Sequence, residues 1–160
     1  AGLPAAEETT GALARALKDS DAFVRENAAA ALKVQNEYAT DALPALLETA
    51  KDKVPAVRRQ VLLALAAVAP KDERVRGALT GGLKDRDPQV RLRALQGVAE
   101  AMREQRVGPL AAMPSPLLGP AGNVEFLVQG RLGHHGVEAI DAMTTEAVRE
   151  AASLERGAAT

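Results

Sequence analysis

Apolar residues recur along the first hundred positions with the spacing of amphipathic helices. In segments 12–18 and 23–34 they fall three and four residues apart, so each segment presents one apolar face. The short polar side chains of Asp19, Ser20 and Asp21 lie between the two segments, where they can cap free backbone amides. The pattern predicts a helix, a tight turn and a second helix. The stripe expected to be buried on the second helix consists of Val24, Ala28, Ala31 and Leu32.

This pattern returns twice at an interval of 33 residues. Val-Arg pairs begin at positions 24, 57 and 90, and Lys-Asp pairs begin at positions 18, 51 and 84. Pro55 and Pro88 stand at the start of the later second helices, where a missing N–H is tolerated. We predict a mainly α fold with three helical hairpins stacked as a short α-solenoid, whose end hairpins remain exposed. The hairpins span residues 12–34, 42–69 and 73–103, after an N-terminal extension of residues 1–11.

Two runs within the repeat, L-K-D-x-D/V-x-x-V-R and V-R-x-x-A-A-x-A-L, are similar to those of HEAT repeats. The second run is complete only over residues 24–32. The pattern resembles more closely the short bacterial HEAT repeats found in phycobilin-lyase-like proteins. This resemblance implies a non-catalytic scaffold that binds a protein partner, and by analogy it also suggests a regulatory or lyase-like role.

The repeated charged residues allow two interpretations. They form two columns, namely Asp19, Asp52 and Asp85, and Arg25, Arg58 and Arg91. The arginines could form a basic stripe for phosphate. Alternatively, each arginine could meet an aspartate of its own or the next turn, as a structural ladder. The HEAT resemblance and a net charge of -1 favour the ladder.

Composition narrows the class of protein. Hydrophobic residues make up 47% of the chain and aromatic residues 2%, so the core must be built from Ala, Leu and Val, which suits close-packed helices. The balance of 20 basic and 21 acidic residues is unlike that of a dedicated nucleic-acid binder. There is no cysteine for a disulfide or a thiolate metal site, and no run long enough to span a membrane. We therefore expect a cytoplasmic protein without membrane contacts.

The pattern changes after Met102. Three prolines and two glycines in residues 113–123 exclude a helix there. Alternation in residues 124–128 predicts a strand with Val124, Phe126 and Val128 on one face, and residues 107–112 are a possible partner strand. A last helix is expected to start near Thr144 or Thr145. Residues 104–160 should thus form a small β-hairpin and a C-terminal helix, with an open strand edge that favours weak self-association.

The run S-P-L-L-G-P-A-G-N-V-E-F-L at residues 115–127 resembles the closing motif of haemolysin-A-type (FtsJ-like) ribosomal RNA 2′-O-methyltransferases. The likeness extends over about residues 81–160. It implies a fragment or fusion of an S-adenosylmethionine-dependent enzyme that binds and modifies RNA, and it aligns Glu125 with a catalytic glutamate of the family. The motif positions that carry the resemblance are Ser115, Pro116, Gly119, Gly122 and Asn123.

The rest of that catalytic apparatus has no counterpart in the sequence. No glycine-rich turn follows a strand in residues 1–80, and the remaining catalytic residues of the family cannot be placed. We therefore expect no enzymatic activity and no cofactor, with S-adenosylmethionine as the cofactor only under the alternative. The adjacent His134 and His135 do not predict a metal site, because neighbouring side chains seldom face one ion.

Overall fold

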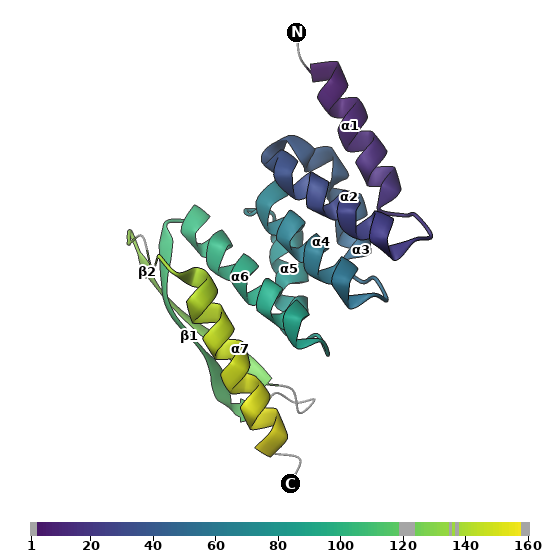
Figure 1. Cartoon of the computed structure of the whole chain (residues 1–160). Helices are drawn as coiled ribbons and strands as arrows, with labels where there is room; N and C mark the ends of the chain where they lie inside the picture. Colours follow the sequence, from purple (N-terminus) through teal and green to yellow (C-terminus); the bar gives the residue numbers. More distant parts are fainter. Residues whose placement is uncertain (1–2, 119–123, 135, 137, 158–160) are drawn as a thin grey trace. The chain divides into compact units, whose positions relative to one another are not determined.

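A computed structural model describes residues 3–118, 124–134, 136 and 138–157 of the chain (Figure 1). The chain divides into two compact units, Ala1–Ala78 and Leu79–Thr160. The boundary between them lies within the predicted third hairpin. Each unit is described by itself.

The first unit consists of two helical hairpins and residues 73–78, the start of a third. Helices α1 (Leu3–Ala16) and α2 (Ala22–Gln35) form the first, and the 3-10 segment η1 (Asn36–Ala42) leads to α3 (Leu43–Thr49) and α4 (Pro55–Val68) of the second. Within this unit α1 packs against α2, and α2 packs against α4 (Figure 1). Leucine, valine and alanine form its core, as the composition predicted. The largest fully buried side chains here are Leu17, Leu32, Leu46, Leu62, Leu65, Val57, Val61, Val68 and Val75.

The helix starts follow from local chemistry. Asp21 has extended backbone angles and accepts a hydrogen bond from the Phe23 amide at 2.8 Å, so it caps α2 as predicted. Asp87 caps α6 in the same way, by accepting from Gln89 and Val90. Pro55 and Pro88 occupy the first helical positions of α4 and α6. Residues within or next to each repeated turn therefore determine where the following helix starts.

The third hairpin contains α5 (Glu73–Gly82) and α6 (Pro88–Glu104). All of residues 12–103 are described, and none of them lies in a strand, which confirms the helical part of the fold prediction. One boundary differs from expectation. The first helix begins at Leu3, inside the predicted N-terminal extension, with Pro4 in its first turn, where a proline is tolerated.

The second unit contains the predicted β-hairpin. Strands β1 (Val107–Leu118) and β2 (Val124–Leu132) pair antiparallel in a two-stranded sheet, with Ala112 opposite Val128 and Pro114 opposite Phe126. Val124 is buried and Phe126 and Val128 are half-buried, whereas Glu125 and Leu127 are exposed. The predicted alternation of faces is confirmed, and both strands are longer than the sequence suggested.

Helix α7 (Ile140–Gly157) and the sheet cover one side of α6. Leu92 and Leu95 of α6 pack with Ala147 and Val148 of α7, and the side chains that surround this cluster are Leu83, Ala112, Phe126 and Val128. Gln96 also donates a 2.7 Å hydrogen bond to Asp141. The apolar face of the hairpin is thus covered within its own unit.

The predicted start of the last helix is wrong. Helix α7 begins at Ile140, and Thr144 lies within it, where its hydroxyl donates to the Ile140 carbonyl at 2.9 Å. A threonine can cap a helix or donate back to the preceding turn, and the sequence does not distinguish the two. Burial of Ile140 extends the apolar face by one turn and moves the start upstream.

Candidate functional site

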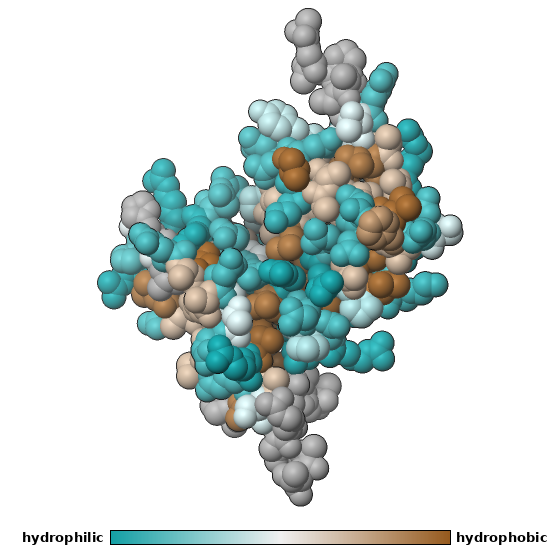
Figure 2. All heavy atoms as spheres, viewed as in Figure 1, coloured by the Kyte–Doolittle hydropathy of each residue, from teal (hydrophilic) through white to brown (hydrophobic). Residues whose placement is uncertain are grey.

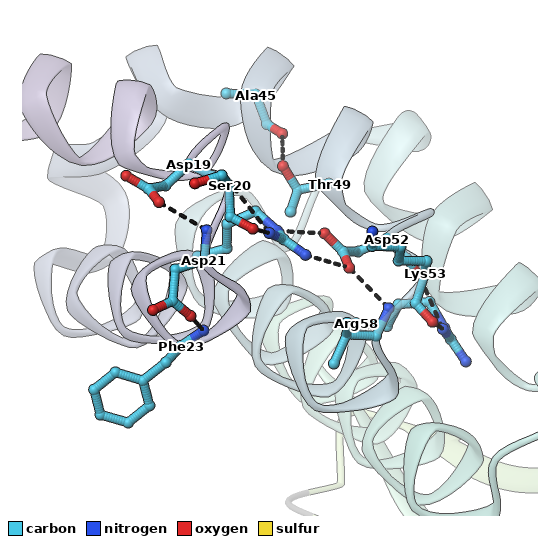
Figure 3. A network of polar contacts seen from close by, with 11 residues as sticks. Asp19, Ser20, Asp21, Phe23, Ala45, Thr49, Asp52, Lys53 and Arg58 are labelled. Carbon is cyan, nitrogen blue, oxygen red and sulfur yellow. Dashed lines mark hydrogen bonds and ion pairs between the residues drawn. The ribbon is translucent and has the colours of Figure 1, made fainter.

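An arginine joins the two hairpins of the first unit. The Nε and Nη2 atoms of Arg25 donate to the two carboxylate oxygens of Asp52 at 2.7 and 3.0 Å. Its Nη1 donates to the carbonyl oxygens of Asp19 and Ser20 in its own turn, at 2.9 and 3.0 Å. Figure 3 shows this network of polar contacts between the Asp19 turn and Asp52. Both charged side chains are largely buried, with 8% and 10% of their surface exposed. The guanidinium therefore uses its donors inside the protein.

The same turn geometry appears in all three repeats. Asp19 accepts from the Asp21 amide, Asp52 from the Val54 amide and Asp85 from the Asp87 amide, each through Oδ1 at 2.8 to 2.9 Å. The arginines at equivalent positions of the repeats also donate to equivalent carbonyl oxygens. Arg58 binds the Asp52 carbonyl at 2.8 Å, and Arg91 binds the Asp85 carbonyl at 2.9 Å. Each of the six residues of the two predicted columns thus contacts its own turn.

The ion pair between Arg25 and Asp52 shifts the pKa of both side chains. The hydrogen bond from Arg25, with a smaller contribution from the Val54 amide, lowers the pKa of the Asp52 carboxyl despite partial burial. In turn the hydrogen bond to Asp52 raises the pKa of Arg25. Each partner favours the charged form of the other, so this turn depends on an ionised aspartate.

A shallow apolar groove lies on the first hairpin, between α1 and α2. Its volume is about 320 Å³, and its walls are Leu13, Ala16, Phe23, Val24, Asn27 and Ala28. Phe23 is 71% exposed and Val24 is 37% exposed. The Phe23 ring points away from the polar network (Figure 3), and apolar residues reach the surface over α1 and α2 (Figure 2). An aromatic side chain beside an apolar recess is typical of a protein-binding surface.

Sequence reasoning placed Val24 in the buried stripe of α2, and this prediction is wrong. Val57, the equivalent residue one repeat later, is fully buried. Because α2 packs against α4 in the first unit, the second hairpin has a neighbour on this side. The sequence did predict that the first hairpin is an exposed end of the array, but the predicted exposure of the last hairpin is wrong, because α7 and the β-hairpin cover one side of α6. It did not identify which residues of the end hairpin line a groove.

A second pocket, of about 630 Å³, lies in the second unit. Among the residues that the structure describes, its lining consists of Arg103, Arg106, Gly133, His134, Gly136 and Glu138. The Gly136 amide donates to Nδ1 of His134 at 2.9 Å, which engages one ring nitrogen. His135 lies outside the described residues. Within the described part of the chain no group of three or more His, Asp and Glu side chains could hold a metal ion.

The residues of the methyltransferase resemblance are not brought together as a site. Glu125 is exposed on β2, and Ser115 is half-buried on β1. Pro116 belongs to β1, but its side chain lies outside the described part, as do Gly119, Gly122 and Asn123. The described contacts place no partner from the catalytic set beside Glu125.

Comparison with known proteins supports the helical repeat predicted from the sequence. No helix that the structure describes is both long and apolar enough to cross a membrane. No curated protein matches the chain significantly, and no comparison supports a relation to methyltransferases. The family model for HEAT repeats matches residues 10–99. This range is more than half of the chain and includes all three Val-Arg pairs. The chain therefore belongs to the HEAT repeat family.

Proposed function

We propose that the protein is a non-catalytic scaffold that binds a protein partner through the groove of its first hairpin. The observation that carries this proposal is the exposure of Phe23 and Val24 beside an apolar recess. Exposed aromatic side chains that border apolar pockets supply much of the energy at protein interfaces. The membership in a helical repeat family supports the same function, because such arrays present extended surfaces to partners.

The polar network supports a structural role for the repeated arginines. Arg25 directs its guanidinium nitrogens toward Asp52 and two backbone carbonyls of its own turn. An arginine engaged in this way has little capacity to bind phosphate. We therefore assign the Asp and Arg columns to the rigidity of the scaffold, and the groove to recognition.

Selection of binding peptides tests the proposal. A library of amphipathic helical peptides is selected on the full chain, and the affinities of the binders are then measured on variants. Val24→Glu should weaken the selected binders by at least about tenfold, because it places a charge in the groove. Val34→Glu is the matched control, since Val34 lies on the same helix, is 84% exposed and is outside the groove. Equal losses in the two variants would contradict the assignment of the groove.

The non-catalytic part of the proposal has its own test. We expect no transfer of radiolabelled methyl groups from S-adenosylmethionine to ribosomal RNA by the purified chain, and no heat of S-adenosylmethionine binding in calorimetry. A lone carboxylate cannot supply both a bound donor and an oriented hydroxyl. Methyl transfer that disappears in Glu125→Gln would overturn this expectation.

A further inference from the structure

The second hairpin shows what a neighbour contributes to this surface. Helix α2 packs against α4, where Val57 and Val61 are fully buried. In addition, Arg25 of the first hairpin reaches forward to Asp52, in the turn of the second. A covered hairpin face in this protein thus has two components, an apolar stripe and an aspartate that accepts an arginine.

Within the described part of the first unit, the first hairpin presents the same two components without a neighbouring hairpin on this side. Its groove residues Val24 and Ala28 stand 33 positions before Val57 and Val61. Leu13 in the groove likewise precedes the fully buried Leu46 by 33 positions. The exposed apolar recess is therefore the counterpart of a face that is buried one repeat later.

Asp19 is the counterpart of Asp52. Oδ1 of each carboxylate accepts the amide two residues later at 2.8 Å, so the two side chains are held by the same turn. Asp52 additionally receives Arg25, whereas no Lys or Arg of the described residues forms an ion pair with Asp19. Asp19 and Asp21 leave two exposed acidic side chains beside the groove. A basic residue on the partner would complement them.

We propose that the partner bound by this groove is a HEAT-type helical hairpin of another protein, whose second helix presents an arginine to Asp19. This inference rests on the proposed function and specifies the partner. The apolar residues of the incoming helix cover Val24, as α2 covers the face of α4. Its guanidinium pairs with the Asp19 carboxylate in a bidentate manner, as Arg25 does with Asp52.

A second copy of this chain is a poor occupant. Arg25 of α2 is already engaged with Asp52, and the side of α6 that carries Leu92 and Leu95 is covered by the β-hairpin and α7. The helices that would have to enter the groove are thus committed within their own chain. An independent hairpin has no such competing contacts.

A synthetic peptide that copies residues 9–41 is a suitable probe, because it contains a helical hairpin with the arginine of Arg25. Fluorescence titration of the full chain should show saturable binding. Asp19→Asn in the chain keeps the oxygen that holds the turn and removes the charge, and should weaken binding about tenfold. Arg25→Gln in the peptide should have a similar effect. Combining the two changes should add little to either alone, because they remove one interaction.

Three outcomes of the peptide titration would overturn the proposal. The peptide fails to bind saturably, the losses caused by the two changes are independent, or the binding is insensitive to Val24→Glu. If selected helical peptides still bind the groove while the hairpin peptide does not, the inference fails and the proposed function remains. If Val24→Glu affects neither class of peptide, both fail. Sedimentation of the chain alone provides a further measurement, since a dimer abolished by Val24→Glu but not by Val34→Glu would make a second copy the occupant.

Discussion

The first and second hairpins carry the same sequence pattern but have different surroundings. Val24 and Val57 occupy equivalent positions, yet Val24 is 37% exposed and Val57 is fully buried. Asp19 and Asp52 are held by equivalent turns, yet the Asp52 carboxylate pairs with Arg25, whereas no Lys or Arg of the described residues pairs with the Asp19 carboxylate. Burial and ion pairing in this repeat therefore depend on the neighbouring hairpin.

The largest expected difference concerns the two valines. Val57→Asp should lower the free energy of unfolding by about 4 kcal/mol, because it buries a charge without a partner. Val24→Asp should cost less than about 1 kcal/mol, since water reaches the side chain. Urea unfolding followed by circular dichroism measures both. Similar losses would mean that the first hairpin is covered in solution.

The two aspartates provide the next comparison. Asp52→Asn should cost about 1–2 kcal/mol, because the buried guanidinium of Arg25 loses its charged partner. Asp19→Asn should cost less than about 0.5 kcal/mol, since its carboxylate is exposed. Asparagine keeps an oxygen to accept the turn amide at both positions. Equal costs in urea would show that the turn, and not the ion pair, determines the effect.

Hydrogen exchange extends the comparison to the second unit. Amides in residues 124–128 should exchange about tenfold faster than those in residues 61–68 of α4. Among the described residues no further strand pairs with the edges of the two-stranded sheet, and the sheet is covered on one face, whereas α4 is rich in buried residues. Equal protection in a monomeric sample would indicate that the hairpin is as stable as the repeats.

Acid should diminish the contribution of Asp52. Its folded pKa lies below its unfolded value, so it stabilises the protein fully above the unfolded pKa, near 3.8, and this stabilisation is lost as the pH falls. The difference in unfolding free energy between the wild type and Asp52→Asn should therefore shrink from pH 7 to pH 3. The pKa of Asp72, which Arg74 lowers to about 2, adds an acid-sensitive contribution common to both proteins. A difference that is constant with pH would contradict the role of the ion pair.

Much of the fold could be predicted because its signals are local. The helical spacing, the cap at Asp21 and the prolines at positions 55 and 88 act within a few residues. The faces of β2 also followed from its alternation. The start of α7 could not be predicted, because a threonine has competing roles and the burial of Ile140 is nonlocal.

The repeat, the turns and the residue types that meet between hairpins follow directly from the amino-acid sequence. Which copy of each repeated position is buried is known only from the packing of the helices, because burial depends on a helix far away in the chain. It also showed that the apolar face of the C-terminal hairpin is covered by α6 and α7 of its own unit. The groove beside Phe23 is likewise known only from the packing of the helices. An apolar stripe has the same sequence whether or not a neighbour covers it, and only the packing of distant segments distinguishes core from binding surface.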